Sequence, residues 1–209
     1  MIKSYIVRSG DHLEKIAHNA GLLPDAIWNH PKNKALAGKR PDRNQLREGD
    51  LLFLPIEEAQ PLPLQVGAKN AFSATVPEIE THLRFADPNG PFANEHYTVE
   101  GLSEPLEGMT DAEGALVLVT PVTTAVAKIR FEKKNRTFMV MLGEMDPLEE
   151  VSGVQKRLSA LGYFKGTTSG RLDEFTKRAL VNFQEAKKLE QTGKMDAVTL
   201  AALKEAYGC

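Results

Sequence analysis

The spacing of apolar residues at the start of the chain predicts two short strands that enclose two helices. Residues 4–7 and 51–54 are runs of strand-forming residues. Between them, apolar residues recur at helical spacing over residues 13–20, and a second short helical pattern covers residues 24–29. The predicted order is strand, helix, helix, strand.

Polar and special residues at the ends of these two helices support the prediction. Asp11 stands where an N-cap belongs, and Glu14 follows three residues later, as in a capping box. Gly21 is placed to end the first helix in a left-handed conformation, and Pro24 suits the first turn of the second helix.

The middle of the chain changes to a strand-like period. Runs rich in β-branched and aromatic residues alternate with Gly, Pro, Asn and Asp, which favour turns. Six or seven strands of this length imply a small β-sandwich or an open barrel. The runs are residues 71–76, 79–85, 96–99, 115–119, 125–131 and 137–142.

The last segment returns to a helical period and contains an internal repeat. Residues 170–180 and 193–203 share the pattern Gly, basic, apolar, Asp, any, apolar, Thr, any, any, Ala, Leu. Asp173 and Asp196 are the expected N-caps of two helices, and an earlier helix should end at Gly162. We expect three helices around one core, with these apolar stripes: Val154, Leu158 and Leu161; Phe175, Ala179 and Phe183; Val198, Ala202 and Ala206.

Two Pro-containing acidic stretches, residues 55–63 and 143–150, divide the chain. They predict a multidomain α+β protein with a βααβ module at residues 1–56, a small β-sandwich at residues 64–145 and a three-helix domain at residues 147–209. The length of 209 residues suits several small domains.

Charge and apolar runs exclude several partners. The 26 basic and 28 acidic side chains give a net charge of −2, which argues against nucleic acid as a partner. No apolar run is long enough for membrane insertion, and the N-terminal residues lack the apolar core of a signal peptide. We therefore expect synthesis in the cytoplasm without a signal peptide. Delivery to the periplasm or the exterior would then need a dedicated secretion system.

The first segment resembles the LysM module, a βααβ fold that binds N-acetylglucosamine-containing glycans. Residues 5–13 (YIVRSGDHL) and 49–55 (GDLLFLP) carry the resemblance, with Ile16 and Ala17. His12 stands where the family usually has Thr or Ser, and residues 30–48 are longer than in compact members. The resemblance implies a shallow glycan groove between the loops next to the two strands. The implied glycan-binding residues are Gly10, Asp11, His12, Leu13, Ile27 and Asn29.

Several of these residues have a structural interpretation that stays open at this point. In that interpretation, Asp11 is a helix cap and Leu13 a core residue, and neither contacts a glycan. Trp28, the single tryptophan, is either a sugar platform or part of the core.

The last segment resembles the peptidoglycan-binding domain that accompanies many cell-wall hydrolases. Residues 154–164, 170–184 and 192–203 reproduce its pattern. A second glycan site would use Tyr163 and Phe164, whose alternative role is to pack at the turn after Gly162.

The middle segment resembles transthyretin-like or immunoglobulin-like domains, through residues 97–101 and 108–114. Such domains occur in spike proteins of type VI secretion systems, where they dock cargo. The middle segment has seven basic and 11 acidic residues between positions 61 and 145, and this net charge of −4 would steer the encounter with a partner.

No catalytic constellation is found in the sequence. A zinc site would have to use His82, His96 and Asp87, which are more simply surface residues of strands and loops. Cys209, the only cysteine, lies at the chain end without groups that would activate a nucleophile. Glu149 and Glu150 are adjacent carboxylates that we interpret as favourable charge near a helix N-terminus.

We therefore expect a non-enzymatic protein without cofactor or metal that binds peptidoglycan through its two terminal modules, with avidity from linking two weak sites. The alternative is a structural adaptor or cargo-docking component of a type VI or related contractile secretion system, with a spike protein or an effector as partner.

Overall fold

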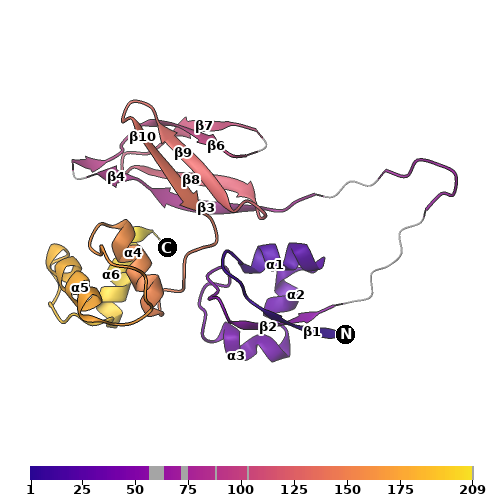
Figure 1. Ribbon diagram of the computed structural model, residues 1–209, viewed down its shortest axis with the longest axis horizontal. Coiled ribbons are helices and arrows are strands. Elements are labelled where there is room, and N and C mark those ends of the chain that lie inside the picture. The colour runs from indigo at the N-terminus through magenta and orange to yellow at the C-terminus, as the bar shows by residue number, and fades with distance from the viewer. Residues whose placement is uncertain (57–63, 72–74, 88, 103, 209) are drawn as a thin grey trace.

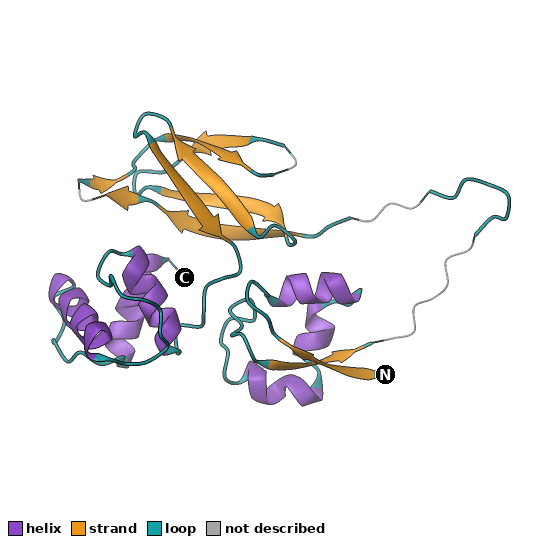
Figure 2. Ribbon diagram, in the orientation of Figure 1, coloured by secondary structure: helices purple, strands orange, loops and turns teal. Residues whose placement is uncertain are grey.

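The computed structural model contains both helices and strands, as the sequence predicts (Figure 1). Within the described residues, the buried hydrophobic side chains form three clusters, one in each of the three segments. Figure 2 shows the strands of the middle segment on one side of the molecule and two helical groups side by side on the other. The structure describes residues 1–56, 64–71, 75–87, 89–102 and 104–208.

The N-terminal module, residues 1–56, is built on an antiparallel pair of strands in which Tyr5 lies opposite Leu52. Leu13, Ile27 and Leu52 are fully buried in its core. In chain order, its elements are β1 (Ile2–Ile6), α1 (Leu13–Ala20), α2 (Pro24–Trp28), η1 (Pro31–Asn33), α3 (Lys34–Ala37) and β2 (Leu51–Pro55).

The short helices η1 and α3 were not predicted, because their residues show no apolar periodicity. Asn33 holds this stretch in place, since its side-chain amide donates to the carbonyls of Ile27 and Phe53 and its oxygen accepts from Phe53 N. These hydrogen bonds satisfy a fully buried polar side chain and connect the added helices to β2.

The predicted N-cap of α1 is wrong by one residue. His12 is the N-cap, and its Nδ1 accepts from Lys15 N. Asp11 instead closes the preceding turn, because its carboxylate accepts from Arg8 N at 2.9 Å and from the Tyr5 hydroxyl at 2.7 Å. The predicted left-handed termination at Gly21 is confirmed by its φ of 65°.

The middle segment forms sheets that pack around one aromatic core. Among its described residues, one sheet has the strand order β10-β9-β6-β7, and β3 pairs with β8. Phe131 lies at the centre, with the rings of Phe85 and Phe92 at about 5 Å between centroids. The strands are β3 (Glu78–Arg84), β4 (Ala86–Asp87), β5 (Gly90–Pro91), β6 (His96–Glu100), β7 (Leu106–Met109), β8 (Ala115–Pro121), β9 (Val126–Phe131) and β10 (Arg136–Met141).

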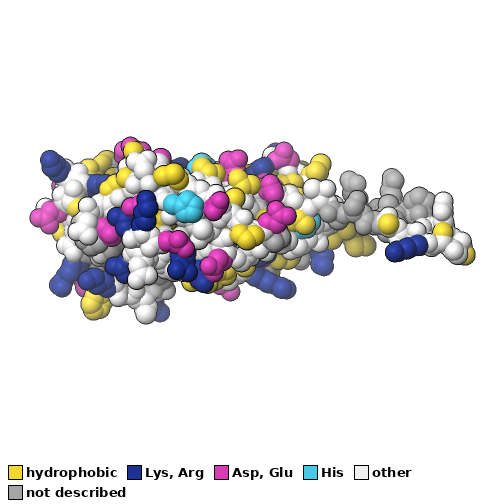
Figure 3. Space-filling model, turned by 90° about the horizontal axis from the view of Figure 1, so that it is seen from above, with side chains coloured by type: hydrophobic (Ala, Val, Ile, Leu, Met, Phe, Trp, Pro, Cys, Tyr) yellow, Lys and Arg dark blue, Asp and Glu magenta, His cyan; other side chains and the backbone are white. Residues whose placement is uncertain are grey.

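Two details of the predicted strand pattern are wrong. The described residues of the 71–76 run are not in a strand, and residues 72–74 lie outside the described part of the chain. The strands β4, β5 and β7 were missed because they are short, and none of the four residues of β7 is fully buried. The exposed face of the sandwich carries interspersed acidic and basic side chains (Figure 3).

The C-terminal helical domain contains α4 (Val151–Ala160), α5 (Glu174–Ala186) and α6 (Ala197–Tyr207). Asp173 and Asp196 are the N-caps of α5 and α6, as predicted, and each accepts from the backbone N–H three residues later. The hydrogen bonds that Asp173 and Asp196 accept from Thr176 and Thr199 lower the pKa of both carboxyl groups.

The two copies of the sequence repeat contain the same pair of hydrogen bonds, in which a buried glutamine joins a glycine N–H to a threonine hydroxyl. We call this arrangement the glutamine bracket. Gln155 accepts from Gly170 N at 2.9 Å and donates to the Thr176 hydroxyl at 2.8 Å. Gln184 makes the same two bonds, to Gly193 N and Thr199, at the same distances. Both glutamine side chains are fully buried, so each bracket fixes the loop that leads into the next helix.

The repeat also corrects the predicted apolar stripes. Phe175 and Val198, at equivalent positions of the two copies, are 75% and 64% exposed. The inward position is the next residue, Thr176 or Thr199, because its hydroxyl must reach the buried glutamine. Two large apolar side chains are therefore left on the surface of the domain.

We predict that Gln184→Met destabilises the helical domain by about 1–3 kcal/mol. The methionine fills the space but leaves the N–H of Gly193 buried without an acceptor. Hydrogen exchange of the α5 and α6 amides measures the change. Gln191→Met, at an exposed position, is the matched control. An equal loss of stability in both variants would contradict the stabilising role of the Gln184 hydrogen bonds.

Candidate functional site

A cleft on the helical domain arises from a difference in length between the two repeat copies. Gln155 precedes Gly170 by 15 residues, whereas Gln184 precedes Gly193 by nine. The six additional residues belong to the loop that follows α4, and this loop forms one wall of a cavity of about 630 Å³. The second copy lacks the extra residues that build this wall.

Aromatic side chains define the helical cleft. Phe164 is buried, and Tyr163 packs edge-on against Phe183 with 5.4 Å between the ring centroids. Phe175 lines the cleft from α5 and is largely exposed. Gly166 allows the loop to close over Phe164, since a Cβ there would lie 2.7 Å from the ring.

Polar groups surround these rings. Arg178 and Asn182 follow Phe175 along α5, and Lys165 comes from the loop. A flat apolar surface bordered by amide and cationic groups suits a sugar ring with its acetamide and acidic substituents. Tyr163 and Phe164, predicted from the sequence, both line this cleft, whereas its residues Phe175, Arg178 and Asn182 were not predicted. The unequal spacing of the two repeat copies was the available signal for the longer loop.

The residues predicted for the N-terminal glycan site do not form one exposed surface. Gly10 and Asp11 line a cavity, but the side chains of Leu13 and Ile27 are fully buried in the core. Asn29 is exposed at the end of α2 and does not line that cavity. Trp28 is partly buried and packs against the core of the module.

His12 is turned toward the sandwich and is 6% exposed. Its Nε2 lies 3.2 Å from the Val122 carbonyl oxygen, and its Nδ1 lies 3.4 Å from Lys15 N. Because a carbonyl accepts and an N–H donates, the geometry requires a neutral ring protonated at Nε2. Burial, which disfavours the charged ring, lowers the pKa of His12.

We predict that His12 makes stability depend on pH. The folded pKa is lower than the unfolded value of about 6.5, so the unfolded chain takes up the proton first and stability falls as pH drops below that value. His12→Asn keeps a capping oxygen and removes the titration.

Denaturation of both proteins between about pH 5 and pH 8 tests this. The difference in free energy of unfolding between the native chain and the variant should be constant at the alkaline end of this range. Toward the acidic end, the native chain should lose stability relative to the variant. Parallel curves over the whole range would show that His12 does not contribute.

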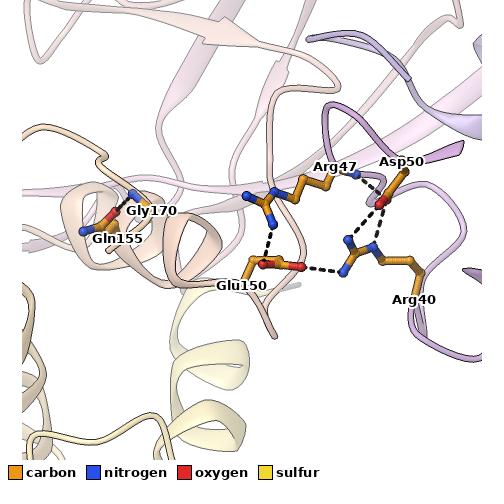
Figure 4. A network of polar contacts seen from close by, with 6 residues as sticks. All are labelled: Arg40, Arg47, Asp50, Glu150, Gln155 and Gly170. Carbon is orange, nitrogen blue, oxygen red and sulfur yellow. Dashed lines mark hydrogen bonds and ion pairs between the residues drawn. The ribbon is translucent and has the colours of Figure 1, made fainter. Parts of the chain in front are cut away.

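A network of ion pairs joins the N-terminal module to the helical domain (Figure 4). Arg40 is 7% exposed and donates through Nε and Nη2 to Asp50 and through Nη1 to Glu150, each at 2.9 Å. Arg47 reaches the other oxygen of Glu150 at 3.0 Å. Glu150 is at the N-cap position of α4, so its charge lies near the helix N-terminus as we interpret it, but its carboxylate binds these guanidinium groups and makes no capping hydrogen bond.

Arg157 extends the same junction. It is fully buried and donates to the Gln45 side chain at 2.8 Å and to the Asp146 carbonyl at 2.9 Å. The long loop of residues 30–48 contributes three side chains to this junction: Arg40, Gln45 and Arg47. Side chains of this loop therefore contact the helical domain.

The described part of the chain contains no group of three or more His, Cys, Asp and Glu side chains arranged to hold a metal ion. His82 and His96 lie on β3 and β6, which belong to different sheets. In the same residues, no helix has the length and apolar character that a membrane span requires. Cys209 lies outside the described residues.

Residues 147–203 match a protein-family model described as "Putative peptidoglycan binding domain". The match covers α4, α5 and most of α6, together with the loop that forms the helical cleft. It confirms the resemblance predicted for the last segment. Comparison with curated proteins and with solved structures finds no match. The resemblances of the first and middle segments stay predictions.

Proposed function

We propose that this protein is a non-enzymatic peptidoglycan-binding protein that uses the helical cleft to bind the glycan. The observation that carries the proposal is the position of the cleft inside the region that matches the peptidoglycan-binding family. Sugar rings would stack on Phe175 and Tyr163, and Asn182 would bind an acetamide group.

The resemblance of residues 1–56 to LysM supports a second contact with the same polymer. The junction gives this contact a fixed geometry, because Arg40 and Arg47 connect the module to Glu150 of the helical domain. Two contacts held at a fixed separation increase affinity for a repeating polymer when their separation matches its repeat.

A second candidate function is a structural adaptor of a type VI or related contractile secretion system. It rests on the resemblance of the middle segment to transthyretin-like or immunoglobulin-like docking domains. The outer strands of its larger sheet, β7 and β10, expose Met109, Met139 and Met141. Exposed edge strands of this kind can pair with a strand of a spike protein or effector. Such a system would also provide a route to the periplasm or the exterior.

We predict that Phe175→Ala weakens binding to purified peptidoglycan sacculi about five- to thirtyfold. The ring is a central, exposed aromatic contact, and losing such an anchor costs roughly 1–2 kcal/mol. Because Phe175 is mostly exposed, the substitution should leave the fold intact. Sedimentation of the full chain with sacculi measures retention.

Val198→Ala is the matched control, since Val198 occupies the equivalent exposed position of the second repeat copy, away from the cleft. The account requires retention of this variant to equal that of the native chain. Equal losses in both variants would place binding outside the cleft. Retention of neither the native chain nor the variants would favour the adaptor function.

A further inference from the structure

A second cavity, of about 390 Å³, lies where the N-terminal module meets the helical domain. The N-terminal module contributes residues 8–11 and 46–48, and the helical domain contributes Ser152, Lys156 and residues 168–170. Gly143, Glu144 and Asp146 of the connecting segment complete the lining. This junction cavity therefore exists only when both parts are in place, and a single module would not contain it.

Hydrogen bonds fix each wall of the junction cavity. Asp11 closes the turn of residues 8–11, and Asp50 accepts from Arg47 N at 2.9 Å beside residues 46–48. On the opposite wall, Gln155 accepts from Gly170 N and donates to Ser169 and the Arg171 carbonyl. Figure 4 shows Gln155 and Gly170 on one side of the junction and Asp50 with Arg40 on the other. A preformed cavity reduces the ordering cost of binding.

The junction cavity differs chemically from the helical cleft. Among the described residues that line it, none is aromatic, and Leu46 is the single large apolar side chain. Sugar stacking is therefore not supported here. The connecting segment contacts the loop after β1, because Glu144 accepts from the Ser9 hydroxyl and its Oε1 lies 3.2 Å from the position that a Gly10 Cβ would take.

Most charged groups in the lining already have partners. Lys156 pairs with Asp146, Arg47 pairs with Glu150, and Glu144 binds Ser9. In the described part of the chain, four lining side chains form no side-chain hydrogen bond or ion pair: the cation of Arg8, the anion of Glu48, and the hydroxyls of Ser152 and Thr168. A complementary ligand carries a carboxylate, an amine and neutral hydrogen-bonding groups between them.

We propose that the junction cavity binds a short peptide with free amine and carboxylate groups, through Arg8 and Glu48. This proposal rests on the proposed function in one respect, since peptidoglycan offers such peptides as the stems attached to its glycan. The helical cleft would bind the sugar and the junction cavity the stem peptide. The protein would then recognise cross-linkable peptidoglycan in preference to bare glycan.

The test titrates the full chain calorimetrically with two probes: the synthetic stem tetrapeptide N-acetyl-L-Ala-γ-D-Glu-L-Lys-D-Ala, whose free amine is the Lys side chain, and peptide-free glycan strands. We expect Arg8→Gln and Glu48→Gln each to weaken tetrapeptide binding about five- to thirtyfold and to leave glycan binding unchanged. Phe175→Ala should weaken glycan binding and leave tetrapeptide binding unchanged. Both charged residues are exposed, so the variants keep the fold.

Lys3→Gln, an exposed charge change on β1 outside the lining, is the matched control and should bind the tetrapeptide like the native chain. No tetrapeptide binding by the native chain overturns the proposal, as does equal binding by the native chain and both cavity variants. In either case, retention on sacculi through Phe175 would leave the proposed function standing. Loss of that retention, with tetrapeptide binding intact, would contradict the proposed function alone.

Discussion

The placement of the N-terminal module next to the helical domain, and with it the junction cavity, depends on the Arg40 guanidinium. This group is almost fully buried and binds carboxylates on two sides, Asp50 within its own module and Glu150 on the helical domain. The hydrogen bonds with Asp50 raise the pKa of Arg40 further above its ordinary value, so the charge is always present. Removing one partner of a buried ion pair costs about 3–5 kcal/mol, whereas an exposed pair contributes about 0–1 kcal/mol. Exposed pairs such as Lys177 with Glu174 therefore matter much less here.

The interactions of Arg40 show what the long loop before β2 does: it fixes the start of β2 and contacts the helical domain. Asp50 is the residue directly before β2, so the ion pair fixes the start of that strand. The same loop carries Gln45 and Arg47 to Arg157 and Glu150. The two terminal modules are consequently held next to each other although the whole sandwich separates them in sequence. A flexible tether would supply only an effective concentration, whereas this junction also creates a cavity between the modules.

The sequence predicted those features that depend on local patterns. Asp173, Asp196 and Gly21 end or begin helices as expected, because capping depends on a few neighbouring residues. The N-cap of α1 was misplaced because Asp11 and His12 can both accept from a backbone N–H. Tyr5 decides between them, since its hydroxyl and Arg8 N occupy the Asp11 carboxylate.

The features that the sequence did not predict depend on contacts between distant positions. Phe175 fits an apolar stripe with Ala179 and Phe183, but the buried Gln155 takes Thr176 inward and leaves Phe175 exposed. The partners of Glu150 are more than 100 residues away, so no local pattern could distinguish it from Glu149. For the helical cleft, the sequence predicted the aromatic residues of the loop, Tyr163 and Phe164. It did not predict the lining residues on α5, which lie farther along the chain.

The central claim is that the ion pairs of Arg40 and Arg47 with Glu150 hold the two terminal modules at a fixed separation. The distance between the modules tests this claim most directly. Spin labels at Lys34→Cys on α3 and Glu185→Cys on α5, in a chain with Cys209→Ser, would report that distance by pulsed electron paramagnetic resonance. The account predicts one narrow distance distribution, which Glu150→Ala broadens and the adjacent, exposed Glu149→Ala leaves unchanged. A broad distribution in the chain that retains Glu150, or equal distributions in all three proteins, would contradict it.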